Sequence, residues 1–257
     1  TNITVALSEP GVSYQLRNND GNVNVGDPVN GNEGTINLPT GNLNSTTTFN
    51  VLATNTTTLC SVQLTETETV TVEPTPVNPT LATATPASGS TVCQGATVSA
   101  TFNAGSGGNG TDSYQYSLDN GGSWNAYTPG SNLTAGTQTI LIQGRRNAAV
   151  CGTSWTTLAN WNVELTPLAG AITKSPNTEA VCVGENVSAT FGAGSGGNGT
   201  DTYEYRFDGT GGWSAYTSGT PLSTTGHTQV EIRSTRNAAV CTPNTVTATW
   251  TVNPLPT

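Results

Sequence analysis

Five cysteines are the residues of this 257-residue chain whose type and spacing suit covalent chemistry. Cys93 and Cys182 stand at equivalent places in two similar stretches, as do Cys151 and Cys241, and about 58 residues separate the two cysteines of each stretch. This spacing predicts two intradomain disulfides, Cys93–Cys151 and Cys182–Cys241, which persist in oxidising places outside the cytoplasm. A metal site or a cysteine nucleophile is disfavoured, because the chain has no Cys-x-x-Cys and a single histidine, His227.

Cys60 is left over by this pairing. It matches Cys151 and Cys241 in its surroundings, so the cysteine that would pair with it is expected about 58 residues earlier, just before Thr1. We therefore predict that Cys60 has no partner within the given sequence. We interpret this sequence as part of a longer chain.

Two pairs of aromatic residues form a candidate ligand-binding site. Trp124 with Tyr127, and Trp213 with Tyr216, lie in loops rich in glycine and serine. Exposed rings of this kind stack on sugar rings, whereas buried ones cap one end of a core, and burial is the favoured alternative. Exposure of these rings would therefore favour carbohydrate binding, and their burial a structural role.

Two further motifs are interpreted as structural. Residues 117–124 fit Ser-x-Asp-x-Gly-x-Ser/Thr-Trp, which resembles the Asp-box hairpin of sialidases, a structural motif away from their catalytic site. Residues 104–112 recur unchanged at 193–201 but lack the lysine of a phosphate-binding loop. The nearby carboxylates are too few for a typical calcium site, so we expect a flexible loop. They are Asp112 with Asp119 in one copy, and Asp201 with Glu204 and Asp208 in the other.

The charge balance excludes several classes of function. There are 16 acidic and 7 basic residues, which give a net charge of −9, and only 9% of residues are charged. A chain this acidic repels nucleic acids and anionic membranes, and no apolar run approaches the roughly 20 residues that span a bilayer. No acid or nucleophile recurs beside His227, so we expect no enzyme activity, no metal and no cofactor.

The elements that position these residues belong to an internal repeat. Residues 93–151 recur at 182–241, with an offset of 89 residues early and 90 later, and a more distant copy precedes them. Val98, Ala100 and Phe102 alternate with polar residues, and this period of two indicates a half-buried strand. Several such strands in each copy predict an all-β fold class, with tandem immunoglobulin-like β-sandwich domains in an elongated array and a small barrel as the alternative.

Proline-rich connectors separate the copies. The predicted domains are a first repeat in residues 1–74, truncated at its N-terminus, a second in 75–166 and a third in 167–257. Proline makes such connectors semi-rigid spacers. The expected cores contain Val98, Phe102, Tyr116, Ile140, Ile142 and Trp161 in the second repeat, and Val187, Phe191, Tyr205, Val230, Ile232 and Trp250 in the third.

Together these motifs resemble the repeats of giant cell-surface proteins of Bacteroidota. The motifs are Cys-x-Gly followed by Val-Ser-Ala-Thr-Phe, then Tyr-x-Tyr-Ser-x-Asp-x-Gly-x-x-Trp from Tyr114 to Trp124, Arg-Asn-Ala-Ala-Val-Cys, and a closing Trp-x-Val. The resemblance implies export by the type IX secretion system and display as a long surface fibre, similar to the adhesins of gliding bacteria.

The leading functional hypothesis is structural. We expect stalk or spacer repeats of an extracellular surface adhesin or filament; the alternative is a carbohydrate-binding module array that uses the loop aromatics. The expected partners are neighbouring repeats of the same polypeptide, surface polysaccharide or lateral copies of the chain, with no nucleic acid and no membrane span.

Overall fold

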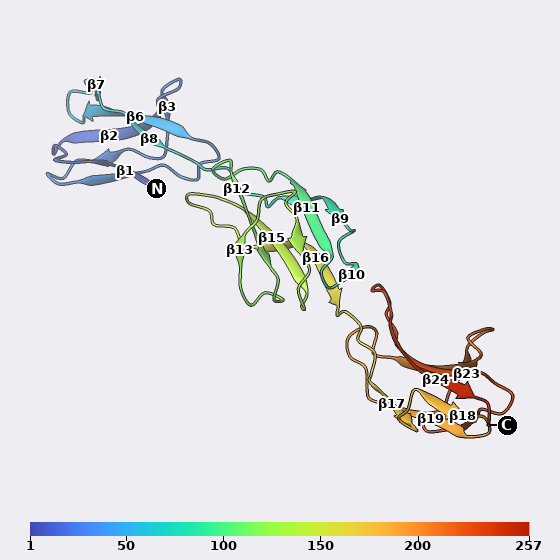
Figure 1. Cartoon of the computed structure of the whole chain (residues 1–257). Helices are drawn as coiled ribbons and strands as arrows, with labels where there is room; N and C mark the ends of the chain where they lie inside the picture. The colour runs from blue at the N-terminus through green and yellow to red at the C-terminus, as the bar shows by residue number, and fades with distance from the viewer. Residues whose placement is uncertain (257) are drawn as a thin grey trace. The chain divides into compact units, whose positions relative to one another are not determined.

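A computed structural model describes residues 1–256 of the chain, in which every regular element is a β-strand (Figure 1). The all-β fold class is thereby confirmed, and no helix within these residues is long and apolar enough to cross a membrane. The backbone forms two compact units: residues 1–78 group with 105–112 and 145–154, and the rest form the second unit. Parts of the predicted second domain thus belong to the first unit, and the predicted domain boundaries stay a prediction.

The first unit contains two sheets around one hydrophobic cluster. β1 (Asn2–Val5) pairs with β5 (Ile36–Pro39), and β2 (Val12–Asn18) pairs with β6 (Thr47–Asn55). The second of these sheets is completed by β3 (Val23–Asn24), β4 (Val29–Asn30), β7 (Ser61–Gln63) and β8 (Glu68–Val70). The cluster contains the almost fully buried side chains of Leu16, Leu38 and Phe49.

The second unit uses one strand arrangement twice. In the second repeat a five-stranded sheet has the order β10 (Thr91–Cys93), β16 (Thr156–Glu164), β15 (Ile140–Arg146), β12 (Asp112–Ser117) and β13 (Asn125–Ala126), and a three-stranded sheet has the order β14 (Leu133–Thr134), β11 (Thr97–Asn103) and β9 (Thr80–Thr85). In the third repeat the sheets are β18 (Ala180–Cys182), β24 (Asn244–Asn253), β23 (Gln229–Arg236), β20 (Asp201–Phe207) and β21 (Ser214–Ala215), and β17 (Ile172–Ser175), β19 (Asn186–Phe191) and β22 (Leu222–Ser223). Two separate sheets around a shared core make an immunoglobulin-like sandwich rather than the small barrel considered as the alternative.

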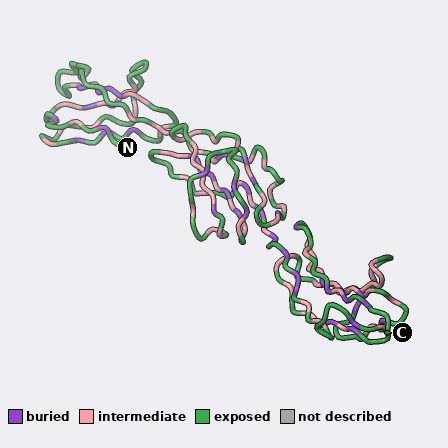
Figure 2. Tube along the Cα trace, in the orientation of Figure 1, coloured by how far each residue is buried: buried purple, intermediate pink, exposed green. Residues whose placement is uncertain are grey.

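Alternation along the strands fills each core, and buried residues follow the strands of every repeat (Figure 2). In β15, Ile140 and Ile142 are fully buried, whereas Leu141 between them is only half-buried. The predicted core is confirmed: the fully buried members are Val98, Ile140, Ile142, Trp161, Val187, Val230, Ile232 and Trp250, and the partly buried ones packed against them are Phe102, Tyr116, Phe191 and Tyr205.

One strand pairing in each repeat of the second unit is parallel, and it positions a cysteine. β10 runs parallel to β16 with Cys93 beside Glu164, and β18 runs parallel to β24 with Cys182 beside Asn253. Each of these cysteines therefore lies at the end of its repeat's last strand, where the chain leaves the sandwich.

Candidate functional site

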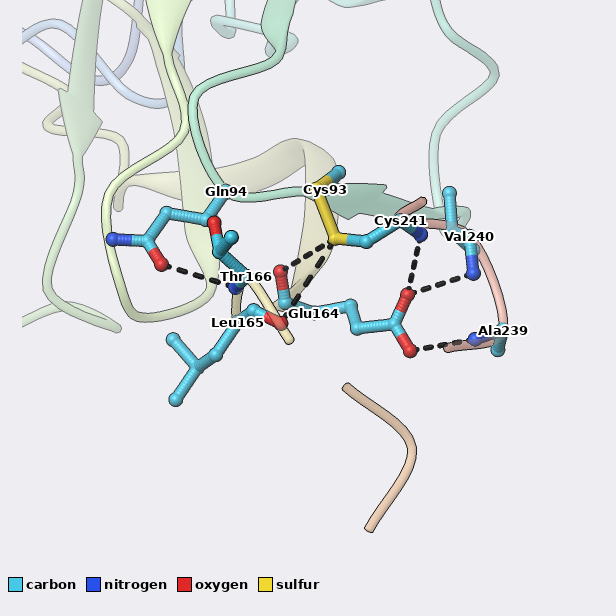
Figure 3. The surroundings of a disulfide bond; sticks show 8 residues. All are labelled: Cys93, Gln94, Glu164, Leu165, Thr166, Ala239, Val240 and Cys241. Carbon is cyan, nitrogen blue, oxygen red and sulfur yellow. Dashed lines mark hydrogen bonds between the residues drawn. A yellow bond between two sulfur atoms is a disulfide. The ribbon is translucent and has the colours of Figure 1, made fainter. Parts of the chain in front are cut away.

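The disulfide lies between repeats and not within one. Cys93, at the end of β10, is bonded to Cys241, which follows β23, and 148 residues separate the two (Figure 3). Cys151 and Cys182 are free and exposed. The predicted bridges Cys93–Cys151 and Cys182–Cys241 are therefore wrong. Cys60 is also free, as predicted.

Strand direction is the physical reason for this correction. In the third repeat Cys182 lies beside Asn253, the last residue of β24, whereas Cys241 comes shortly before Asn244, where that strand begins. β24 has 10 residues, so at about 3.3 Å per residue its ends are about 30 Å apart. Two bonded cysteines need Cα atoms within about 7 Å, so an intradomain bridge cannot form.

A carboxylate holds the loop that carries the bonded cysteine. Glu164, the last residue of β16, accepts hydrogen bonds from the amides of Ala239, Val240 and Cys241, each 2.7 Å long (Figure 3). These bonds, that from Ala239 above all, hold the pKa of Glu164 below its ordinary value. The bonded sulfur of Cys241 lies 3.4 Å from the carbonyl oxygen of Glu164. We call Glu164, residues 239–241 and Cys93 the second clasp.

The same arrangement occurs one repeat earlier without the disulfide. Glu73 accepts hydrogen bonds from the amides of Ala149 (2.7 Å), Val150 (2.8 Å) and Cys151 (3.2 Å). The amide of Ala149 contributes most to lowering the pKa of Glu73. We call Glu73 and residues 149–151 the first clasp. Its cysteine is exposed, whereas Cys241 is only 6% exposed.

The glycine-rich loops pack against the connectors beside the clasps. The amide of Gly197 donates to the carbonyl of Leu165 (2.8 Å), and a Cβ on Gly197 would lie 2.1 Å from the carbonyl oxygen of Asn237. Gly108 makes the equivalent bond to Pro74 (2.8 Å) in the first unit. Only glycine fits so close to a carbonyl, which explains why both places have glycine at this position. The loop expected to be flexible is thus a packed one.

The carboxylates of these loops face arginines. Asp112 lies 3.2 Å from a guanidinium nitrogen of Arg146, and Asp201 lies 3.3 Å from one of Arg236. Both pairs are largely buried, so each arginine supplies the charge that a calcium ion would otherwise provide. Within residues 1–256 no group of three or more His, Cys, Asp or Glu side chains is placed to hold a metal.

Two of the four candidate ligand-binding aromatics are core residues. Tyr127 is 5% exposed and its hydroxyl bonds to the backbone of Ala100 and Ser131. Tyr216 is 6% exposed and bonds in the same way to Ala189 and to the carbonyl of Thr220. Burial, the alternative favoured from the sequence, is thus confirmed for both tyrosines, and the ligand-binding candidate is corrected at these two positions: a buried phenol takes backbone partners because an unpaired hydroxyl there is costly.

The two tryptophans are half-buried. Two guanidinium groups lie over the ring of Trp213, with the guanidinium carbon 4.5 Å from the ring centroid for Arg206 and 4.1 Å for Arg233. These cation–π contacts compete with a sugar for stacking on this ring.

The Asp-box motif forms the expected turn. Asp119 accepts hydrogen bonds from the hydroxyl of Ser123 (2.6 Å), the hydroxyl of Ser117 (2.7 Å) and the amide of Ser123 (2.8 Å). These bonds, led by the Ser123 hydroxyl, lower the pKa of Asp119 to about 2. In the third repeat Asp208 instead bonds to the amide of Thr228 (2.6 Å) and to Nδ1 of His227 (2.8 Å), so the single histidine belongs to a turn.

Neither clasp glutamate is among the residues predicted from the sequence. A signal was present, because Glu73 follows Cys60 by the same 13 residues by which Glu164 follows Cys151. Each glutamate stands at the start of a proline-containing connector, and the connectors were interpreted only as spacers.

No family model and no curated protein matches the chain. Among solved structures, three N-terminal domains of the Highly Immunogenic Outer Capsid protein of bacteriophage RB49 are 13% identical over 100% of this chain and 95% of theirs, with a TM-score of 0.36. A Ca2+-stabilized adhesin that helps an Antarctic bacterium bind ice is 16% identical over 98% of this chain and 67% of its own, with a TM-score of 0.38. Protocadherin gammaB7 domains EC3-6 are 13% identical over 99% and 68%, with a TM-score of 0.42. These likenesses concern the fold alone.

Proposed function

We propose that the chain supplies stalk or spacer repeats of an extracellular surface adhesin or filament, and that the clasps join consecutive repeats against extension. The observation that carries the proposal is the recurrence of one contact: Glu73 and Glu164 each hold the same loop of the following repeat by three amide hydrogen bonds. A contact that recurs at both junctions is expected where successive repeats must stay joined under tension.

The disulfide supports a mechanical role. When the chain is pulled from its two ends, force passes from Cys93 directly to Cys241, and the 148-residue span between them bears none of it. At about 3.4 Å per extended residue, this span would otherwise add about 500 Å of extension. Most of the second and third repeats is thereby withheld from stretching.

The proposed location is the cell surface. A disulfide between repeats is stable in an oxidising compartment and is reduced in a typical cytosol. A surface with few charges and many neutral hydroxyl and amide groups suits an exposed stalk. Membership of the giant surface proteins of Bacteroidota, with export by the type IX secretion system, is part of this proposal and rests on the resemblance of the sequence motifs.

The carbohydrate-binding alternative loses three of its four candidate rings. Tyr127 and Tyr216 are buried, and arginines cover the ring of Trp213. The partners that we propose are therefore neighbouring repeats of the same polypeptide.

Pulling single molecules by their two ends tests the proposal. We expect the oxidised chain to stop about 500 Å short of the extension reached after reduction, and the Cys93→Ser variant to reach full extension without reductant. Full extension of the oxidised wild-type chain at low force would reject the tension-bearing role. Specific capture of the chain by a polysaccharide, abolished by Trp124→Ala, would restore the alternative.

A further inference from the structure

We infer that the first clasp is a receptor for a cysteine-bearing strand, and that Cys151 is its cross-linking residue. The strand has the chemistry of β10: it runs parallel to residues 71–73 and places a cysteine against Cys151. This cross-link between the strand cysteine and Cys151 goes beyond the spacer role. It is inferred independently of whether the chain bears tension.

The strand register of the first repeat defines where the cysteine of such a strand would stand relative to Thr1. The amide of Thr40 donates to the carbonyl of Thr1 (3.1 Å), as the amide of Ala135 donates to that of Ala96 (2.8 Å). On the same ladders Ile3 is paired with Leu38, and Val98 with Leu133. Thr1 thus occupies the place of Ala96, and the place of Cys93 is three residues before Thr1.

The edge that would receive the strand is open in the first repeat. In the second repeat β10 pairs with Asn162, Val163 and Glu164. Their counterparts are Thr71, Val72 and Glu73, because each set ends at the clasp glutamate. A hollow of about 560 Å³ lies along this edge, and its lining includes Thr1, Val72, Glu73 and Cys151. The hollow therefore borders the free strand edge, Thr1, where the strand would enter, and the thiol of Cys151.

The cysteine loop is already held in the bonding position. Glu73 makes the three amide bonds to residues 149–151 that Glu164 makes to residues 239–241. The clasps differ in cover: Glu164 is 8% exposed beneath its neighbours, whereas Glu73 is half-buried and Cys151 exposed. A strand in the hollow would give the first clasp the cover that the second already has.

The bond forms by two thiol–disulfide exchanges with a disulfide oxidant, for which glutathione disulfide serves as the probe. The thiolate of the strand cysteine attacks one glutathione sulfur and releases one glutathione thiolate. The Cys151 thiolate then attacks the strand sulfur of this mixed disulfide and displaces the second. Two electrons pass to the oxidant, and two glutathione thiols take up the two protons lost by the protein.

The test adds the five residues Thr-Val-Cys-Gln-Gly, the sequence of residues 91–95, directly before Thr1. After exposure to glutathione disulfide, we expect peptide mapping to find the added cysteine bonded to Cys151, and Cys60 and Cys182 bonded to no other cysteine of the chain. The matched control carries serine in place of the added cysteine, and peptide mapping should then find Cys151 bonded to no other cysteine of the chain.

Other outcomes overturn the inference. An added cysteine that stays as a mixed disulfide with glutathione, or that bonds to Cys60 or Cys182, shows that the first clasp does not receive such a strand. In the chain that carries the five added residues, Glu73→Gln should slow the formation of the bond to Cys151. An unchanged rate would show that the clasp does not position the loop. The Cys93–Cys241 bond is mapped in the same samples and reports that the second unit is folded.

Discussion

The two clasps share one set of carboxylate hydrogen bonds and differ in a covalent bond and in how far they are covered. Glu73 and Glu164 accept the same three amide hydrogen bonds from equivalent loops, yet Cys241 is bonded and buried whereas Cys151 is a free, exposed thiol. The carboxylate therefore fixes the cysteine loop without help from the disulfide. The bond is added to a loop that is already ordered, so its formation carries a smaller entropic cost.

The largest expected effect comes from removing the bond of the second clasp. In the chain-entropy model, closing a loop of 148 residues stabilises the folded state by about 5 kcal/mol. We expect Cys93→Ser to lower the free energy of unfolding of the second unit by about 2–5 kcal/mol under oxidising conditions. Denaturant unfolding followed through the buried Trp161 and Trp250 measures this loss.

The matched control for this prediction is Cys151→Ser, which should leave unfolding of both units unchanged. In reductant the Cys93→Ser variant and the wild-type chain should unfold together. A loss of stability in oxidised Cys151→Ser equal to that in Cys93→Ser would mean that the intradomain pairing forms in solution.

A smaller effect is expected from replacing glycine with alanine where the glycine-rich loop lies against a backbone carbonyl. Gly197→Ala combines a φ of +57° with a Cβ 2.1 Å from the carbonyl oxygen of Asn237, whereas Gly199→Ala has a φ of +88° and open space. The φ alone costs about 1–2 kcal/mol, and displacing the neighbouring backbone adds about 1–3 kcal/mol. We expect Gly197→Ala to be the more destabilising in thermal unfolding.

The same change at the first junction sharpens the comparison. Gly108→Ala would place a Cβ 2.2 Å from the carbonyl oxygen of Asn147, so its cost should match that of Gly197→Ala in the reduced chain. Equal costs for Gly197→Ala and Gly199→Ala would show that the close approach does not exist in solution.

The sequence predicted what depends on local periodicity. Alternation along Val98, Ala100 and Phe102 places one side of a strand in a core, and the burial of Val98 and Ala100 follows from it. Burial of Tyr127 and Tyr216 was favoured for a related reason, since a large ring in a small sandwich contributes most to stability inside it.

The disulfide pairing could not be predicted from spacing. A separation of about 58 residues is the same whether two cysteines lie at one end of a sandwich or at opposite ends, and only the strand order decides between these. The parallel pairing of β10 with β16 puts Cys93 at the exit of its repeat, next to Glu164. The clasp glutamates were missed because a single acid in a connector has no periodic pattern.

A still smaller, local effect is expected from the clasp carboxylates. The folded-state pKa of both glutamates is lowered from 4.5 by amide hydrogen bonds. Their contribution is therefore present above pH 4.5 and is lost as the pH falls through the lowered values. Amide hydrogen exchange should show protection of Ala149 and Ala239 that declines over this acidic range, and low protection at all pH values in Glu73→Gln and Glu164→Gln.

Because of the disulfide, the exchange protection of the two amides should respond differently to acid. Ala149 depends on Glu73 alone and should lose all of its protection in acid, whereas Ala239 should keep part of it in the oxidised chain and lose that part after reduction. Protection of Ala149 that is unchanged in Glu73→Gln would show that the carboxylate does not hold the loop.

The smallest expected effect on the clasps comes from a change that leaves both untouched. Trp213→Ala removes the ring over which the guanidinium groups of Arg206 and Arg233 lie, and exposed cation–π contacts contribute about 0.5–1 kcal/mol each. We expect a loss of about 1–2 kcal/mol in the unfolding of the third repeat, from the two contacts together, with unchanged exchange protection of Ala149 and Ala239 in the folded chain. If the protection of Ala239 also falls, the second clasp depends on the general stability of its repeat, and the difference between the clasps cannot be assigned to the disulfide. If it does not, the contrast between Cys151 and Cys241 is local, as the hydrogen bonds of Glu73 and Glu164 imply.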